Sequence, residues 1–213
     1  MKRAILFDFD GTLVNTNDIV IASFQHTYRY YKGHEEEVSK ITSFFGEPLL
    51  VTMAREFPET SPEEAMETYR SFQYQHKDEL VTVFDGIKSM LSELKARDLV
   101  LAIVTSRTTS STVSYLEQFD MADYFDLIIS CDDTAVHKPN PEPVLLAMEK
   151  LGADKSESLM IGDGDFDLGC AHNAGIEAAL VGWHITENKV KPDYYTETPE
   201  DIVSLIDRLN SGL

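Results

Sequence analysis

The chain has 213 residues, of which 43% are hydrophobic, so its composition is that of a folded globular protein and argues against global disorder. Its 18 basic and 37 acidic residues give a formal net charge of −19, which argues against nucleic acid and anionic membranes as partners. No apolar run reaches about 18 residues, and Asp8 interrupts the first apolar stretch too early for a secretory signal, so we expect a cytoplasmic protein.

The chain contains two cysteines, Cys131 and Cys170, and no Cys-x-x-Cys pair. This sparse usage is typical of a protein that stays in a reducing compartment. We therefore expect two buried thiols rather than a disulfide framework or a cysteine metal site.

The first predicted element is a short buried strand over residues 3–9, and a long helical stretch, residues 15–82, follows it without a convincing strand. Ser61 begins one helix clearly, because it is an N-cap residue followed by Pro62 and two acids. We predict a helical domain over 15–82, inserted into a core formed by 1–14 and 83–213. The predicted helices of the insert cover residues 19–31, 35–44, 49–56 and 62–79.

Beyond the insert, short apolar runs alternate with amphipathic patterns, and a capped helix begins at Thr198. The apolar runs do not alternate with polar residues, which is typical of strands covered on both faces. This order predicts an α/β fold with a Rossmann-like parallel sheet. The predicted strands are 100–104, 126–129, 159–161 and 179–181, and the predicted helices are 87–95, 112–118, 141–150 and 168–174.

Acidic residues follow the first strand directly, in the order Asp8-Phe9-Asp10-Gly11-Thr12. Ligands bind at the carboxyl ends of the strands in an open parallel sheet. Two carboxylates two residues apart would point to opposite faces of a continuing strand, but Gly11 permits a sharp turn that brings Asp10 back toward the site. A solvated turn with two acids is the alternative.

A second acidic segment, Gly162-Asp163-Gly164-Asp165-Phe166-Asp167, follows the fourth strand. It is not a dinucleotide fingerprint, because position 167 is not glycine, and it is not an EF-hand loop, because Leu168 and Ala174 replace the required Gly and Glu. The remaining interpretation is a carboxylate cluster that faces Asp8 and Asp10. Such a set of oxygen ligands suits Mg²⁺.

Two further strand ends carry groups that could bind an anion. Thr105-Ser106-Arg107 places a hydroxyl and backbone N–H groups at the start of a helix, where an ordinary helix cap is the alternative. Lys138 lies in a loop stiffened by Pro139 and Pro141, which fix where its side chain points. In so acidic a chain, a lysine held beside acidic clusters indicates neutralisation of phosphate.

Taken in order, these four strand ends resemble the four motifs of the haloacid dehalogenase-like (HAD) superfamily of phosphotransferases. The helical insert lies where that superfamily carries its C1 cap domain, and the resemblance covers nearly the whole chain. The matching residues are Asp8 to Thr12 for the first motif, Thr105 and Ser106 for the second, Lys138 for the third, and Gly162 and Asp163 with Asp167 for the fourth.

The resemblance implies phosphoryl transfer through an aspartyl phosphate. Asp8 would attack phosphorus, and Asp10 would protonate the leaving group and then activate water. Mg²⁺ would be held by Asp8, the backbone carbonyl of Asp10, and Asp163. A dehalogenase lacks the second carboxylate, so Asp10 argues against that activity.

The remaining motif residues receive supporting roles from the same resemblance. Thr105 and the Ser106 N–H would hold phosphoryl oxygens, and Lys138 would neutralise charge in the transition state. Asp167 would orient Lys138 or a metal-bound water. Asp165 has no assigned role, and we expect it to face solvent.

Segments of the insert resemble the phosphoglycolate phosphatases and, more closely, the PpaX-type inorganic pyrophosphatases of bacteria. The resemblance implies a small phosphorylated metabolite or pyrophosphate as substrate, and the sequence leaves both a monomer and a homodimer open as the oligomeric state. A phosphomutase of the β-phosphoglucomutase type shares the core motifs and remains an alternative, whereas a non-catalytic protein would normally have lost an acid. The segments are Asn15-Thr16-Asn17, Ile21 to Thr27, Thr68-Tyr69-Arg70 and His76 to Leu80.

Substrate contacts are expected from the turn Phe45-Gly46-Glu47-Pro48-Leu49, where Gly46 allows close approach of the backbone. Glu47 could bind the metal or its waters, or could instead cap the helix that follows. The cap is expected to open about hinges near residues 13–15 and 81–85. The candidate substrate contacts are Gly11, Asn15, Gly46, Glu47 and His76, with His26 as a further histidine that could touch phosphate.

Overall fold

The apolar runs form a six-stranded sheet in the computed structural model, which describes residues 1–183 and 188–212. All strands are parallel, and their order is β5-β4-β1-β6-β7-β8, so the first strand of the chain lies in the middle. The α/β prediction is therefore confirmed. The strands are β1 (Ala4–Phe7), β4 (Val100–Val104), β5 (Leu127–Ile129), β6 (Ser158–Gly162), β7 (Glu177–Val181) and β8 (Tyr194–Thr196).

The register brings the ends of the central strands level with one another. Phe7, the last residue of β1, is paired with Ile103 on one side and with Ile161 on the other. The backbone N–H of Asp8 then donates to the Ile161 carbonyl at 2.9 Å. The residues that follow β1, β4 and β6 consequently meet at one edge of the sheet, as the parallel arrangement requires.

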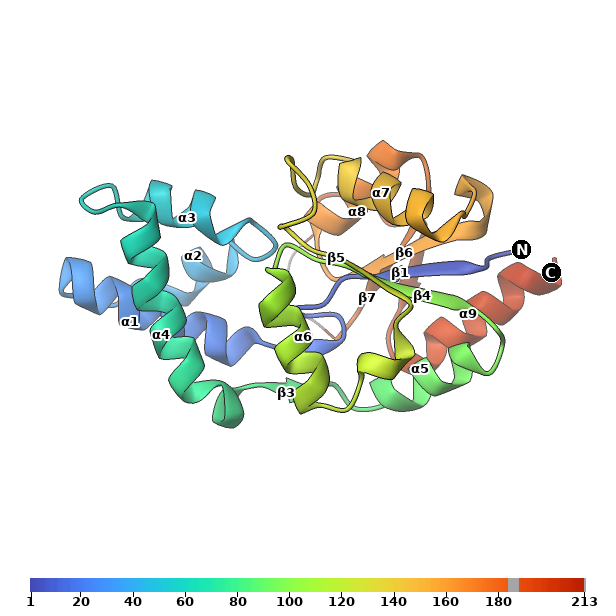
Figure 1. Cartoon of the computed structure of the whole chain (residues 1–213), viewed down its shortest axis with the longest axis horizontal. Helices are drawn as coiled ribbons and strands as arrows, with labels where there is room; N and C mark the ends of the chain where they lie inside the picture. Colours follow the sequence, from blue (N-terminus) through green and yellow to red (C-terminus); the bar gives the residue numbers. More distant parts are fainter. Residues whose placement is uncertain (184–187, 213) are drawn as a thin grey trace.

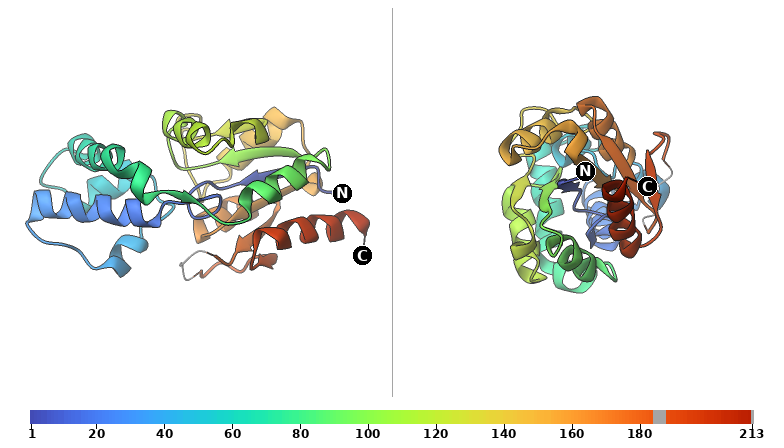
Figure 2. Two further views of the ribbon diagram at one scale, coloured as in Figure 1. Left: turned by 90° about the horizontal axis from the view of Figure 1, so that it is seen from below. Right: turned by 90° about the vertical axis from the view of Figure 1, so that its right-hand side faces the viewer.

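Helices cover both faces of the sheet and bury alternate residues of its strands. Ile5 and Phe7 pack with residues of α5, α6 and α9, whereas Leu6 packs on the opposite side with residues of α7 and α8. Figures 1 and 2 show the two layers, with α7 and α8 on one side of the sheet and α5 and α9 on the other. The helices are α5 (Ile87–Lys95), α6 (Thr109–Gln118), α7 (Glu142–Leu151), α8 (Asp165–Ala174) and α9 (Pro199–Ser211).

The insert is a separate group of helices beside the sheet (Figure 1). Its own core contains Phe24, Tyr28, Met53, Phe57 and Tyr69, all buried. The last helix begins as its sequence predicted, with a Ser61 side chain that accepts from the Glu64 N–H. Its helices are α1 (Asn17–Lys32), α2 (Val38–Thr42), α3 (Leu49–Glu56) and α4 (Pro62–Leu80).

Two short strands join the insert to the core, and the sequence patterns did not indicate them. β2 (Val14–Asn15) pairs antiparallel with β3 (Thr82–Val83), so the chain leaves and re-enters the core through a two-stranded link. Only two residues long, these strands show no periodicity that could separate them from loops.

Other elements also differ from the prediction, and α6 and α8 each begin three residues before the predicted helix, at Thr109 and Asp165. The helix predicted over 35–44 is shortened to α2, because residues 33–37 form the turn after α1 instead. Strand β8 was not predicted, because it is a three-residue edge strand in which Tyr195 remains 59% exposed. Among the residues that the structure describes, no helix is both long and apolar enough to cross a membrane.

Candidate active site

A cavity of about 960 Å³ lies where the carboxyl edge of the sheet faces the insert. The core contributes the residues after β1, β4 and β6, and the insert contributes α1, α3, α4 and the turn at Gly46. Most of the predicted site residues therefore share one cavity. Those that line it are Asp8, Asp10, Gly11, Gly46, Glu47, Thr105, Ser106 and Asp163.

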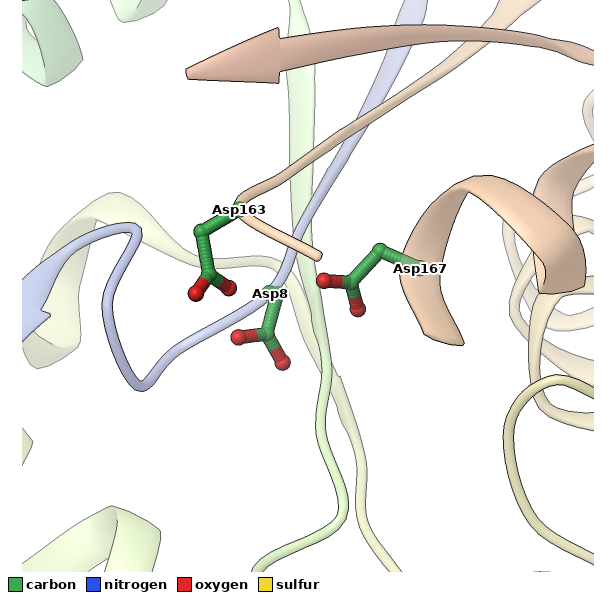
Figure 3. A group of neighbouring side chains, drawn as sticks. All are labelled: Asp8, Asp163 and Asp167. Carbon is green, nitrogen blue, oxygen red and sulfur yellow. The ribbon is translucent and has the colours of Figure 1, made fainter. Parts of the chain in front are cut away.

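Three buried carboxylates form the acidic cluster of this site: Asp8, Asp163 and Asp167. Each offers an oxygen within 4.8 Å of the other two. Figure 3 shows them converging from different elements, with Asp8 after β1, Asp163 after β6 and Asp167 in the first turn of α8. A set of carboxylate oxygens at this spacing could hold a divalent cation.

Lys138 ties two members of the acidic cluster together. Its ammonium donates to Asp8 Oδ1 and to Asp167 Oδ1, both at 2.6 Å. A third hydrogen bond goes to the Val104 carbonyl at 3.0 Å, so all three of its donors are engaged. The lysine side chain is only 3% exposed and holds Asp8 from behind the cavity.

The cluster carries more negative than positive charge. Burial and the neighbouring Asp167 raise the pKa of Asp8 well above its ordinary value, although Lys138 acts in the opposite direction. Burial likewise raises the pKa of Asp167, and Asp167 and Asp8 together raise the pKa of Lys138 against its own burial. Three carboxylates with one ammonium leave an excess of negative charge, which a divalent cation would offset.

Gly162 makes the acidic cluster possible, because the Asp167 side chain packs directly on it. A Cβ at position 162 would lie 2.4 Å from the Asp167 Cβ, which is closer than real carbon atoms approach. The other Asp167 oxygen, Oδ2, accepts from the Gly164 N–H at 3.2 Å. The glycine at the end of β6 therefore gives Asp167 the room to reach Lys138.

Asp10 stands apart from the acidic cluster and has its own partners. Gly11 adopts a φ of 76°, so the chain turns sharply after Asp10 as the sequence predicted. Asp10 Oδ1 accepts from Thr16 Oγ1 and from Arg107 Nη1, both at 2.6 Å. The two carboxylates of the first motif thus line one cavity while they sit in different electrostatic surroundings.

Arg107 is the main site residue to which sequence reasoning assigned no role. Its guanidinium pairs with Asp10 and lies over the Tyr115 ring, 4.8 Å from the centroid. Burial alone would lower its pKa, but Asp10 and two tyrosines outweigh burial and raise it. Its place directly after Thr105-Ser106 was the available signal, but an arginine at a helix start normally points into solvent.

Thr105 and Ser106 follow β4 directly and precede this arginine. Thr105 is buried, and its Oγ1 accepts from the Arg107 N–H at 3.2 Å, which closes a tight turn. Ser106 Oγ donates to the Gly46 carbonyl at 3.0 Å. This hydrogen bond joins the second motif to the turn of the insert, and a Lys77 Nζ bond to Ser114 Oγ at 3.2 Å makes a second link between insert and core.

Glu47 lines the cavity, but its carboxylate is paired within the insert. It accepts from Thr52 Oγ1 at 2.6 Å and from Arg55 Nη1 at 2.7 Å. Because its charge is balanced there, the metal-binding role that the sequence left open for Glu47 has no support from these contacts. Gly46 beside it adopts a φ of 82°, and a Cβ at this position would lie 3.0 Å from the Phe166 ring.

The structure does not bring Asn15, His26 or His76 to the lining of the cavity. Both histidine rings pack on Phe72, with ring centroids 4.8 Å away for His26 and 4.3 Å away for His76. Asn15 lies in β2 and accepts from the Asn17 N–H. The two histidines therefore pack inside the insert, and Asn15 belongs to the link between the insert and the core.

Asp165 does not face solvent, contrary to the expectation. It is half-buried, and its carboxylate accepts from the backbone N–H groups of Lys189 and Val190 at 2.9 to 3.1 Å. It therefore anchors a later loop. Of the two cysteines, Cys170 is buried and Cys131 is half-buried at the cavity, and both are free thiols.

Comparison with known proteins agrees with this geometry. Residues 5–181 match the haloacid dehalogenase-like hydrolase family, and the chain belongs to that family, as its motifs predicted. Pyrophosphatase PpaX of Halalkalibacterium halodurans is 38% identical over 209 residues, which cover 96% of each chain. Pyrophosphatase PpaX of Bacillus velezensis is 36% identical over 206 residues, which cover 95% of each chain.

Solved structures show the same fold. A haloacid dehalogenase-like family hydrolase from Streptococcus pneumoniae superposes with a TM-score of 0.84 at 24% identity, over 96% of this chain and 98% of the other. A protein from Lactobacillus plantarum, provisionally named a phosphoglycolate phosphatase, superposes with a TM-score of 0.87 at 26% identity, over 96% of this chain and all of the other. The similarity thus spans both the core and the insert.

Proposed function

We propose that the protein is a Mg²⁺-dependent phosphohydrolase that works through an aspartyl phosphate on Asp8 and that its substrate is inorganic pyrophosphate. The observation that carries the proposal is the Asp8 carboxylate, which lines the cavity at the end of the central strand and is held there by Lys138. Two relatives named pyrophosphatase, at 36% and 38% identity over nearly the whole chain, support the choice of substrate.

The first half-reaction uses both acids of the first motif. An Asp8 oxygen forms a bond to phosphorus while the bond from phosphorus to the leaving oxygen breaks. Asp10, as a carboxylic acid, gives its proton to that oxygen. The lining of one cavity by Asp8 and Asp10, with Asp10 oriented by Thr16 and Arg107, supports this division of roles.

The second half-reaction reverses the proton transfer. A water oxygen attacks phosphorus, Asp10 accepts the water proton, and the bond between Asp8 and phosphorus breaks to release phosphate. Thr105 and the Ser106 N–H would hold the phosphoryl oxygens, and Lys138 would offset the charge that develops on them. Asp167 would keep Lys138 in place through their 2.6 Å ion pair.

The donor set fits Mg²⁺. Asp8, Asp163 and the backbone carbonyl of Asp10 would hold the ion, with Asp167 as the remaining carboxylate of the acidic cluster. Bound there, Mg²⁺ would offset the charge of the acids and of the phosphoryl group, so that an anionic substrate could approach Asp8. The excess negative charge of the acidic cluster supports this assignment.

Phosphoglycolate is the second candidate substrate, favoured by the structural similarity to the Lactobacillus plantarum protein. The phosphoryl group would react in the same place, and the rest of the molecule would occupy the part of the cavity under the insert. The two candidates share a small size and a second anionic group.

Phosphate release in the presence of Mg²⁺ tests the proposal, with pyrophosphate, phosphoglycolate, a hexose phosphate and p-nitrophenyl phosphate as substrates. We expect kcat/KM for pyrophosphate to exceed that for p-nitrophenyl phosphate by about 100-fold, or about 2.7 kcal/mol. Asp8→Asn, measured in parallel, should release no phosphate from any of them. Equal rates on all four compounds would contradict pyrophosphate as the substrate. Transfer of phosphate to a sugar acceptor would favour a phosphomutase.

A further inference from the structure

Arg107 has a position that its structural contacts alone do not explain. A buried guanidinium is costly, because its charge must be removed from water. Arg107 is only 12% exposed at its side chain, yet it lines the cavity instead of lying in the core between two elements. Its one ionic partner among the described residues is Asp10, which is itself 32% exposed and belongs to the catalytic pair.

The guanidinium is held rigidly. Its Nε and Nη2 donate to Ser111 Oγ, in the first turn of α6, at 3.2 and 2.8 Å, and its Cζ lies over the Tyr115 ring, 4.8 Å from the centroid. Nη1 then points to Asp10. A planar fork fixed on three sides is suited to bind an oxyanion with a defined orientation, which a mobile surface lysine is not.

Arg107 also lies on the side of the cavity where the leaving group must be. In the proposed function, Asp10 contacts the bridging oxygen of the substrate, because it protonates that oxygen. Arg107 is bonded to the same carboxylate, so it adjoins the atoms beyond the bridging oxygen. Lys138, in contrast, is bonded to Asp8 and lies on the side of the phosphoryl group that is transferred.

Two cations of the insert face the same region. Arg70 and Lys77 both come from α4 and line the cavity, and Arg70 and Arg107 both act to lower the pKa of Tyr69, which burial raises. Lys77 Nζ and Arg107 Cζ lie 5.9 and 4.8 Å from the centroid of the Tyr115 ring, so these two cations share one corner of the cavity, although Glu67 and Asp132 line the cavity as well. In a chain of net charge −19, such a corner is where a second anionic group can be bound.

We propose that Arg107 is the specificity-determining residue of the site, and that it binds an anionic group on the leaving part of the substrate. This inference rests on the proposed phosphohydrolase function. The ligand class is a phosphoryl compound with a second oxyanion close to the bridging oxygen. The second phosphoryl of pyrophosphate and the carboxylate of phosphoglycolate are the two sources of that oxyanion, and neutral esters lack it.

Kinetics of Arg107→Gln test the inference on pyrophosphate, phosphoglycolate and p-nitrophenyl phosphate with Mg²⁺. Because Arg107 also orients Asp10, we expect kcat/KM to fall on all three substrates, and to fall about 30-fold further for the substrate whose oxyanion Arg107 binds than for p-nitrophenyl phosphate. A selective loss on pyrophosphate identifies a phosphoryl group as the ligand, and a selective loss on phosphoglycolate identifies a carboxylate. Arg97→Gln, which breaks an exposed ion pair with Asp207 instead, is the matched control for the lost charge.

An equal loss on all three substrates would overturn the inference, because it would mean that Arg107 acts only by orienting Asp10. No loss on any of them would overturn it as well. If the unaltered enzyme released no phosphate from any of the three, the proposed function itself would fail, and that result is distinct from both. Arg107→Lys, which keeps the charge and loses the fork, should give a smaller selective loss and remains informative where Arg107→Gln does not fold.

Binding supplies a readout that does not depend on turnover. Titration calorimetry with imidodiphosphate, a pyrophosphate analogue that carries both phosphoryl groups, should show an affinity loss of at least about tenfold in Arg107→Gln. Inorganic phosphate, which fills the site of the transferred group alone, should bind both proteins equally. Equal losses for both probes would contradict a separate site for the second anionic group.

Discussion

Two groups of charged residues, each built around a buried acid, differ in how that acid is balanced: one lies in the core and the other in the insert. In the insert, Glu56 accepts from Arg55 at 2.8 Å and from Tyr28 at 2.8 Å and pairs with Lys40 at 3.0 Å. Burial opposes its ionisation, but these partners outweigh burial and lower the pKa of Glu56 from 4.5 to about 2. The charge of Glu56 is balanced by residues of the insert itself, so these contacts stabilise the fold.

In the acidic cluster of the core, the pKa values of the acids are shifted in the opposite direction. Asp8 and Asp167 share one lysine, and their pKa values are raised rather than lowered, since burial and mutual repulsion outweigh Lys138. Such an arrangement costs stability in the folded protein. In Glu56 the partners outweigh burial and the acid is structural, whereas in Asp8 burial outweighs the one lysine and the acid lines the cavity.

The largest expected effect comes from Asp8→Asn. Loss of the nucleophile should lower phosphate release by at least about 10,000-fold, which corresponds to about 5.5 kcal/mol of transition-state stabilisation. Because one of the repelling acids becomes neutral, the melting temperature should stay the same or rise. Phosphate release and thermal unfolding of the same sample check the loss of activity and the unchanged stability. A large fall in the melting temperature would mean that Asp8, like Glu56, stabilises the fold, and would contradict the comparison.

Gly162→Ala should have the next largest effect, because the new Cβ would occupy the space of the Asp167 side chain. Displacement of Asp167 from Lys138 should reduce kcat about 100-fold and destabilise the fold by about 1–3 kcal/mol. Gly152→Ala is a control, because a Cβ there meets nothing within 4 Å, although its φ of 58° adds some strain. If Gly162→Ala kept full activity, the packing of Asp167 on Gly162 would not matter for the site.

Addition of Mg²⁺ should stabilise the protein, because it offsets the excess charge of the acidic cluster. At 100 times its dissociation constant the gain is about 2.7 kcal/mol. Thermal unfolding with and without chelator measures it. Asp163→Asn should lose most of the gain and Glu56→Gln should keep all of it, whereas an equal gain in all three proteins would place the ion elsewhere.

Glu56→Gln should have the smallest effect and should act on stability alone. Since Arg55 and Lys40 are close to half exposed and screened by water, we expect a loss of about 2 kcal/mol at neutral pH. The contribution of a carboxylate with a lowered pKa is complete above pH 4.5 and disappears as the pH falls from there toward 2. Urea unfolding of both proteins from pH 7 to pH 3 should therefore show that the difference between their free energies of unfolding shrinks. A constant difference would contradict the lowered pKa of Glu56.

The sequence was most informative where short apolar runs end in chemically distinctive residues. The strand before Asp8 and the strand before Asp163 could be predicted because apolar runs stop abruptly at an acid. Parallel strands place such ends at one edge, so the convergence of the site followed from the fold class alone. The family could be recognised for the same reason.

What could not be predicted depends on contacts between residues that are distant in the sequence. Arg107 meets Asp10 across 97 positions and Asp165 meets Val190 across 25, and neither partner leaves a local pattern. The substrate contacts expected of His76 rested on residue type, whereas the ring packs on Phe72. Strand β8 was missed because an exposed edge strand needs no apolar run.

The most direct test of the central claim is to locate the phosphoryl group on the protein. Asp10→Asn should accumulate phosphoenzyme after mixing with p-nitrophenyl phosphate and Mg²⁺, because p-nitrophenolate leaves without a general acid whereas the water that releases phosphate lacks its general base. Intact mass after acid quench should show one added phosphoryl group, and peptide mapping should place it on Asp8. Phosphate release by Asp8→Asn at the unaltered rate, or a phosphoryl group on another residue, would contradict the account.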